Sequence, residues 1–455
     1  MRPTTAFSIL FFTAGMSLLS PPASRQLTIQ PVYDSTGSTS TLLGYPSTDR
    51  SSNFPDTKSV SSSPPAQRLL SLDALRGVAV LFMIIVNYQG HNPYPALQHV
   101  DWFGFHLIAD QVFPLFLFVA GVAIAFAYKN ARRQPKYPTM LKIARRFVLL
   151  FAIGLLLNAF PFTESDLLQT WRIMGVLQRA AICYVVTTAL YITCGTDALW
   201  PQRYLYFIYP ATIFILWMSL TFAVYNPACQ TRGDLSETCC TETMFDSAVF
   251  GSHSYGIFDP EGTISTLPSL LTSWSGLLIG MHLNRRKPEL HRPLVQYKLI
   301  AHWLLLAAGL ASIAGMFDSL IPIGKPLWTP TFTLLTSAVS IVLFAVNFYL
   351  YDIQRLADKS HPNAAYRAFA YLLYIFLACG RNSTVLYILS ELVLNLFWAV
   401  NVPSGIPLYQ AMQNIMFSTW LPQGLDSLVL SLFWVVLMIL PVAILMDYRR
   451  IYIKL

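Results

Sequence analysis

Ten stretches of mostly apolar residues, each roughly 20 residues long and so matched to a membrane span, recur along this chain. A helix rises about 1.5 Å per residue and the apolar core of a bilayer is about 30 Å thick, so each stretch is long enough to cross a membrane. Charged residues make up only 11% of the chain, well below the roughly 25% of a soluble domain. The sequence therefore predicts an all-α polytopic membrane protein with about ten transmembrane helices, at 72–89, 107–128, 143–161, 173–194, 204–225, 264–283, 299–317, 329–351, 382–401 and 425–446. A weaker apolar segment at 369–377 is predicted to lie at the membrane interface.

The connections between these helices differ sharply in basic residues. Loops on one side of the ten-helix arrangement hold nineteen Lys and Arg residues, and those on the other side hold only Arg172, Arg232 and Lys325. Because basic loops stay in the cytosol, this count predicts that both ends of the ten-helix region are cytoplasmic. Topology thus explains the net charge of +8, and nothing favours a nucleic-acid partner.

The first 66 residues differ from the rest. A positive start, a short apolar core and small residues resemble a signal peptide. Cleavage would invert the predicted orientation, so we expect an uncleaved element or an extra anchor. Residues 21–66 are rich in Ser, Thr and Pro and are predicted to be a disordered tail. The predicted domains are therefore 1–66, an apolar segment with a disordered tail, and 67–455, the transmembrane region.

Three of the six cysteines lie in one outer loop, where an oxidising compartment would permit a bridge. Cys229, Cys239 and Cys240 fall in the long non-cytoplasmic loop 226–263, where one bridge could form. Which pair would form it stays open, as does the alternative of free thiols. The remaining three cysteines lie in or beside apolar segments and are predicted to be packing residues.

Ionisable side chains inside predicted spans are expensive to bury, so each is a hypothesis about function. Asp110, Arg179, Glu391 and Arg381 are in this position. The alternative is that they neutralise one another in structural ion pairs.

The loop after the first span is the best candidate for chemistry. It carries His91, His99, Asp101 and His106 and follows Asn87 at the helix end. A histidine is easily poised as a base near neutral pH, and it needs a second group to fix its tautomer. A base here could deprotonate an amine or hydroxyl arriving from outside. A metal site and a proton-coupled transporter are the alternatives; the metal site lacks a helical ligand pair, and no internal repeat supports the transporter.

Basic residues on the cytoplasmic side exceed what orientation requires. Arg76 enters the first span, and Arg145 and Arg146 belong to a run of seven positive charges within residues 129–146. A donor with phosphate groups, or anionic lipid, would be attracted there.

Several blocks of sequence resemble one known family, in the family's order and over nearly the whole of residues 68–455. They are "RLLSLDALRGVAVLFMIIVNY", "QHVDWFGFHLIADQVFPLFLFVAG", "RIMGVLQRAAICYVV", "FDPEGTISTLPSLLTSWSGLLIGMHL", "IPIGKPLWTPTFTLLTSA", "GRNSTVLYILSE" and "YRRIYIKL". The chain is similar to the heparan-alpha-glucosaminide N-acetyltransferases and their bacterial relatives.

The resemblance implies an acetyl-CoA-dependent enzyme that works across a membrane. CoA would bind from the cytosol, and the acetyl group would go to the amine of a terminal glucosamine on the lumenal side. The family's active histidine corresponds to His99 and its helix-ending asparagine to Asn87, with Asp101 or Asn87 available to orient the ring. It further implies a role in heparan sulfate degradation in a lysosomal or other endomembrane, with the plasma membrane as an alternative.

The remaining site residues follow from the path of the donor. Arg76, Arg145 and Arg146 are expected to bind CoA, and three polar residues are expected to line the way to His99: Gln178, Arg179 and Asn382. Asp259 and Glu261 could hold the substrate ammonium, or could instead be acids that favour the first turn of a helix. No metal is expected, membrane lipids are partners, and a homodimer is left open.

Overall fold

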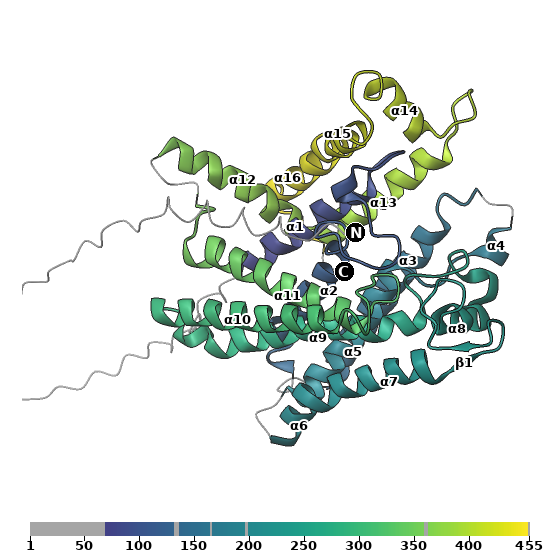
Figure 1. Cartoon of the computed structure of the whole chain (residues 1–455). Coiled ribbons are helices and arrows are strands. Elements are labelled where there is room, and N and C mark those ends of the chain that lie inside the picture. Colours follow the sequence, from purple (N-terminus) through teal and green to yellow (C-terminus); the bar gives the residue numbers. More distant parts are fainter. Residues whose placement is uncertain (1–68, 132–135, 164–165, 196–198, 359–362, 454–455) are drawn as a thin grey trace, which may run out of the picture. The chain divides into compact units, whose positions relative to one another are not determined.

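The computed structural model describes residues 69–131, 136–163, 166–195, 199–358 and 363–453 (Figure 1). The predictions for residues 1–66 fall outside the described residues. The described chain is almost entirely helical, which confirms the all-α membrane class. Its elements are α1 (Leu70–Asn87), α2 (Val112–Ala127), α3 (Lys136–Ala159), α4 (Leu167–Thr170), α5 (Val176–Cys194), α6 (Leu199–Arg203), α7 (Tyr209–Ala223), β1 (Tyr225–Asn226), β2 (Thr231–Arg232), α8 (Thr241–Phe250), α9 (Thr263–Arg286), α10 (Pro293–Phe317), α11 (Pro330–Asn347), α12 (Ala364–Arg381), α13 (Ser383–Ala399), α14 (Leu408–Met416), α15 (Leu425–Trp434) and α16 (Leu440–Tyr448).

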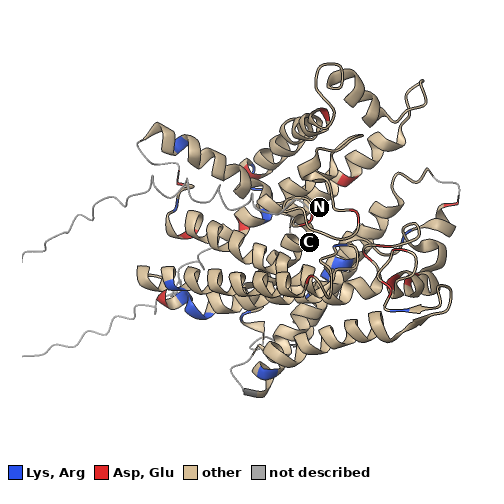
Figure 2. Cartoon of the chain, viewed as in Figure 1, with Lys and Arg blue, Asp and Glu red and all other residues tan. Residues whose placement is uncertain are grey.

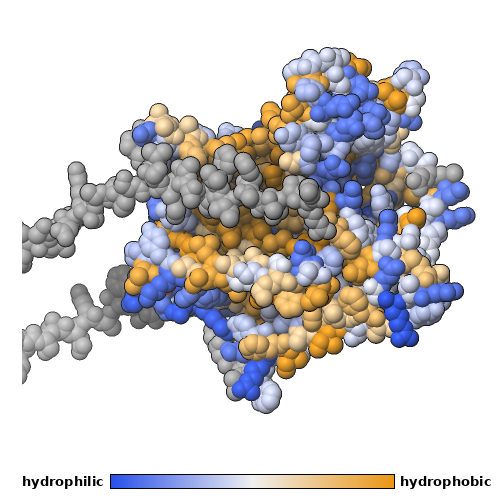
Figure 3. Space-filling model, in the orientation of Figure 1, coloured by the Kyte–Doolittle hydropathy of each residue, from blue (hydrophilic) through white to orange (hydrophobic). Residues whose placement is uncertain are grey.

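Seven helices within the described residues are long and apolar enough to cross a membrane. They are α1, α5, the continuous helix Trp200–Ala223, α9 with its 3₁₀ extension to Glu289, α10, α11 with its π-helical end at Ile353, and the helix Leu425–Tyr448. Hydrophobic residues form a broad band across the face drawn in Figure 3, with hydrophilic residues toward its ends. These helices identify an integral membrane protein.

The predicted count of about ten spans is not confirmed. The helix α2 has 16 residues because residues 107–111 form turns that precede it, and 16 residues span about 24 Å, less than the bilayer core. The helix α3 carries Lys142, Arg145 and Arg146 in its first half, which makes that half too polar for a span. Counting apolar stretches in the sequence includes such segments, because apolar length alone does not show where each helix begins.

The helices α12 and α13 form a broken pair. They meet at Asn382 with a bend of 80°, and together they are long and apolar enough to count as an eighth span or a re-entrant segment. The segment 369–377, predicted to be interfacial, is part of α12 and packs against α1.

Glycines allow the backbones of two helix pairs to approach closely. A Cβ atom on Gly77 of α1 would lie 1.8 Å from the carbonyl oxygen of Phe376, and one on Gly380 of α12 would lie 1.6 Å from that of Asp73. Gly276 of α9 meets α2 in the same way, since its Cβ would lie 2.0 Å from the carbonyl oxygen of Phe118. Small residues allow such close approach where lipid offers no hydrophobic driving force. They hold α1 to α12 and α2 to α9.

The two ends of the helices differ in charge. Lys and Arg gather where α9 ends and α10 begins (Figure 2), in the sequence Arg285–Lys287 and at Arg292 and Lys298. The opposite ends are joined by the loops 88–111, 224–262 and 318–329. We call this the outer end, because the charge count predicts that it faces away from the cytosol.

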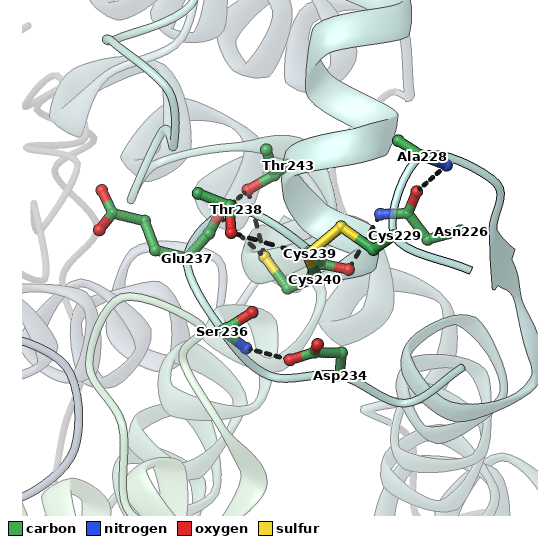
Figure 4. The surroundings of a disulfide bond; sticks show 10 residues. All are labelled: Asn226, Ala228, Cys229, Asp234, Ser236, Glu237, Thr238, Cys239, Cys240 and Thr243. Atoms are coloured by element: carbon green, nitrogen blue, oxygen red, sulfur yellow. Dashed lines mark hydrogen bonds between the residues drawn. A yellow bond between two sulfur atoms is a disulfide. The ribbon is translucent and has the colours of Figure 1, made fainter. Parts of the chain in front are cut away.

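The longest outer loop is held by a disulfide (Figure 4). Cys229 bonds to Cys239, which settles the pairing left open by the sequence, and Cys240 is a buried free thiol. Asn226 Nδ2 donates to the carbonyl oxygen of Cys239 at 3.0 Å, and Thr243 Oγ1 donates to that of Glu237 at 2.6 Å. The loop therefore has a fixed fold of its own.

Candidate functional site

The loop that carries His99 is fixed against three neighbours at the outer end. Leu97 and Ala109 pack with Val86 of α1 in a small buried cluster. Trp102 Nε1 donates to the carbonyl oxygen of Leu235 at 2.7 Å. The backbone N–H of Gly104 donates to the carbonyl oxygen of Ile323 at 2.7 Å. These contacts place His99 beside the outer end of α1 and the loop before α11.

His99 is paired with a buried carboxylate. Its Nδ1 lies 2.9 Å from Asp110 Oδ1, and Asp110 is fully buried. The second oxygen of Asp110 accepts the backbone N–H of His106 at 2.8 Å. We assign the ring proton to Nδ1, because an unprotonated nitrogen would face the carboxylate with two lone pairs. This leaves Nε2 as the acceptor, the arrangement that a general base requires.

Lys325 completes the cluster. Its Nζ lies 2.8 Å from Nδ1 and 3.4 Å from Nε2 of His99, and 3.6 Å from Asp110 Oδ1. With the ring proton on Nδ1, the ammonium of Lys325 donates to Asp110 and not to the ring. Burial lowers the pKa of Lys325, and the attraction of Asp110 opposes that effect without overcoming it. Burial is also the largest influence on His99 and lowers its pKa; Lys325 acts in the same direction, while Asp110 opposes both. The ring therefore stays neutral to lower pH than a free histidine, with 43% of its side chain still exposed.

The partner of His99 corrects one expectation. Neither Asp101 nor Asn87 orients the ring: Asp101 lies on an exposed stretch of the loop, and Asn87 Nδ2 donates instead to Glu391 Oε1 at 3.0 Å. Asp110 takes the role because it sits in the turn before α2, where its backbone is held against the loop. The Nδ1 atom of His106 lies against the carbonyl oxygen of Gln98. Among the described residues, no three His, Cys, Asp or Glu side chains are grouped as metal ligands.

The carboxylates expected to hold a substrate ammonium already have a cation. Arg172 Nη2 lies 2.6 Å from both Asp259 Oδ1 and Glu261 Oε2, and its Nε donates to Asp259 Oδ2 at 3.1 Å. Burial lowers the pKa of Arg172, but these bonds outweigh it and raise the value overall. We call Arg172, Asp259 and Glu261 the arginine cluster.

Arg179 is part of the scaffold at the start of α9. The side chain is fully buried and donates to Thr266 Oγ1, to Ser265 Oγ and to the carbonyl oxygen of Pro260, at 3.2, 2.5 and 2.7 Å. Its guanidinium lies 4.9 Å from the ring centre of Trp328. These contacts join α5 to α9, so the geometry gives Arg179 a structural task, through hydroxyl and carbonyl groups and not through the carboxylate partner of the alternative hypothesis.

The other residues expected to contact the donor lie away from the outer end. Arg146 packs over the ring of Tyr184 at 4.5 Å, and Arg76 lies 3.6 Å from Asp73. Arg145 is exposed. Asn382 bonds the chain's last segment, donating to the carbonyl oxygen of Ile451 and accepting from the N–H of Ile453.

The sequence did not predict two pairings at this site. The pairing of Asn87 with Glu391 spans 304 positions, and that of Lys325 with His99 spans 226. One signal could have found Lys325: it is one of only three basic residues in the predicted outer loops. A lysine in loops that otherwise hold almost no basic residues indicates a specific function for that lysine.

Comparison with known proteins places these residues in a family context. Residues 68–228 match the family model described as heparan-alpha-glucosaminide N-acetyltransferase, catalytic. The chain is 26% identical over 394 residues to heparan-alpha-glucosaminide N-acetyltransferase of Homo sapiens, covering 75% of this chain and 55% of the relative. The Mus musculus protein of the same name is 26% identical over 383 residues, covering 73% and 54%. The chain thus spans about half the length of the curated relatives it matches. The resemblance seen in the sequence blocks is confirmed.

Proposed function

We propose, from this similarity, that the chain is an acyltransferase that moves an acetyl group from cytosolic acetyl-CoA to the amine of a terminal glucosamine on a heparan sulfate-like glycan. The acceptor would bind at the outer end, on the lumenal side of a lysosomal or other endomembrane. Residues 67–455 would form the transmembrane acyltransferase domain.

The observation that carries the proposal is the cluster of His99, Asp110 and Lys325. A glucosamine amine is protonated near neutral pH, and it must lose that proton before it can attack a thioester. His99 has an exposed ring, an acceptor nitrogen fixed by Asp110, and a lowered pKa that keeps it neutral. These are the properties of a general base.

The reaction is a direct transfer. Nε2 of His99 takes a proton from the ammonium, and the amine nitrogen then attacks the thioester carbonyl carbon. The new C–N bond forms as the C–S bond breaks, and CoA leaves as the thiolate, which takes up the second proton that the attacking nitrogen loses as it becomes the amide. A covalent acetyl-histidine is the alternative, and it would hydrolyse readily at so exposed a ring.

The donor would approach from the opposite end of the helices. Arg76, Arg145 and Arg146 lie there and carry the charge that phosphate groups need. The separation of these residues from His99 supports a reaction in which CoA and the acceptor never share a compartment.

One assay tests the function. Purified protein in detergent receives acetyl-CoA and a fluorogenic α-glucosaminide; we expect an N-acetylated product and one free thiol per turnover. No product, together with proton-coupled solute flux in liposomes, would overturn the proposal in favour of a transporter. Radiolabelled acetyl-CoA without acceptor separates the two chemical routes, because label that stays on the protein and is lost in His99→Ala would indicate the covalent one.

A further inference from the structure

A polar cavity of about 750 Å³ opens at the outer end, between the end of α3, the start of α5 and the second half of α13. Asn158, Gln178, Glu391, Asn395 and Trp398 are among the residues that line it. Its size is that of a typical site for a small ligand. No step described so far uses this cavity.

Gln178 is the first sign of a ligand. It is completely buried, and neither its amide nitrogen nor its amide oxygen has a hydrogen-bond partner among the described residues. Two glycines make room for it: a Cβ on Gly154 would lie 2.4 Å from its oxygen, and one on Gly175 would lie 3.0 Å away. Buried amides without partners are rare because they cost free energy. A bound molecule with both donors and acceptors would supply the missing bonds.

Glu391 is the second sign. One of its oxygens accepts the amide of Asn87, and no cationic side chain of the described residues forms an ion pair with it. Arg172 also lines the cavity but is held by Asp259 and Glu261. A carboxylate so placed favours a cationic ligand and disfavours one that carries phosphates.

The cavity walls fit a sugar. Trp171, Tyr255 and Trp398 line it together with the amides, so the wall contains both flat aromatic rings and hydrogen-bonding groups. A pyranose offers apolar ring faces and a belt of hydroxyl groups, which donate and accept as the Gln178 amide requires.

The cavity also lies near the base. Asn87, which holds Glu391, follows Val86, and Val86 packs with Leu97 and Ala109 on the loop that carries His99 and Asp110. Glu261 interacts electrostatically both with His99 and with Tyr387 of the cavity wall.

We propose that this cavity binds the amino sugar acceptor, with Glu391 pairing its ammonium, Asn87 positioning Glu391, and Gln178 bonding its hydroxyl groups. This assignment rests on the proposed function, and it places Gln178 with the acceptor rather than with the donor. Glu391 thereby takes the task expected of Asp259 and Glu261.

The test compares two probes that differ by one charge. Glucosamine and glucose are titrated into the purified full-length protein without any donor. The wild-type protein should bind glucosamine about 10- to 100-fold more tightly than glucose, as expected for a charge-assisted bond. Glu391→Gln should remove this preference, whereas Gln178→Met should weaken both sugars alike. Glu289→Gln is the matched control, because it neutralises a carboxylate that pairs with Arg286 at the cytoplasmic end.

Kinetics add a second readout. Glu391→Gln should raise the KM for the glucosaminide about 10- to 100-fold and leave the KM for acetyl-CoA unchanged. A higher KM for acetyl-CoA alone, or a Glu391→Gln protein that still prefers glucosamine, would overturn the assignment. If the wild-type protein transfers no acetyl group, the proposed function fails, and the preference between the two sugars still decides the cavity. Should Glu391→Gln not fold, Asn87→Ala must reduce the same preference.

Discussion

The arginine cluster and Glu391 lie at the same end of the molecule and contribute to the same cavity, yet their carboxylates are in opposite conditions. Asp259 accepts two bonds from Arg172, and the backbone N–H groups of Tyr255 and Glu261 donate to it at 3.1 and 2.9 Å. Glu391 receives one bond from a neutral amide.

This difference indicates that the carboxylates of the arginine cluster stabilise the fold, whereas Glu391 is available to bind a ligand. A carboxylate surrounded by its own cation and by N–H donors has no capacity left for a ligand, and it fixes the loop that supplies those donors. A carboxylate with a single amide partner keeps a strong affinity for any cation that enters. From residue type alone, the sequence predicts the same ability to bind a ligand for all three acids.

The largest expected effect is on turnover, and it concerns His99, the proposed base. His99→Ala should lower turnover by about 10²- to 10⁴-fold, because the ammonium then loses its base. Thermal unfolding should be unchanged, since the ring is 43% exposed. Turnover and the unfolding temperature are measured on the same preparation; an equal loss of both would mean that His99 is structural.

The next largest effect tests the arginine cluster, in which the carboxylates already have a cation. Arg172→Met should destabilise the protein by about 3–5 kcal/mol, because it leaves two carboxylates without their cation. Thermal unfolding in detergent measures it, with Glu391→Gln as the matched variant that should unfold near the wild-type temperature. If Arg172→Met unfolded no earlier than Glu391→Gln, the distinction between the two sites would be lost.

A fourth acid, Glu242, extends the comparison to the effect of pH on stability. Glu242 of α8 is 1% exposed, and burial raises its pKa to about 7. The folded state therefore holds a proton that the unfolded state releases above pH 4.5, so this stabilisation is present in acid and is lost as the pH rises through about 7. It amounts to roughly 3 kcal/mol. The unfolding temperature should be higher at pH 5 than at pH 8, and Glu242→Gln should reduce that difference; an unchanged difference would refute the assignment.

The smallest expected effect is a change in the pKa of His99 when its neighbour Lys325 is replaced. Lys325→Met removes a positive charge beside His99 and leaves Asp110 without its cation, and both changes raise the pKa of His99. The acidic limb of the rate profile should therefore move to higher pH. Lys298→Met, which neutralises a lysine on α10, is the control, and equal profiles for the two variants would contradict the role given to Lys325.

The sequence predicted the parts of this molecule that depend on local pattern. Apolar length predicted the membrane helices, and the bias of basic residues separated the loop of His99 from Arg145 and Arg146. It did not predict the start of α2, because the five residues from Leu107 to Gln111 form turns instead of extending the helix. That turn is what places Asp110 against His99.

What remained hidden was long-range pairing. Asp101 is two positions from His99 and Asp110 is eleven, so proximity in sequence favoured the wrong acid. The partners of Asp259, Glu261 and Glu391 are 87, 89 and 304 positions away. No periodicity encodes such contacts, because they arise only when helices and loops pack.

The disulfide of the outer loop bears on how the chain matures. Cys240 adjoins Cys239, and an exchange reaction could move the bridge to the wrong neighbour. Such exchange needs a thiolate, and burial raises the pKa of Cys240 to about 11, so only about one thiol in 10⁴ is ionised near neutral pH. The raised pKa and the burial of Cys240 therefore disfavour exchange of the bridge once the loop has folded.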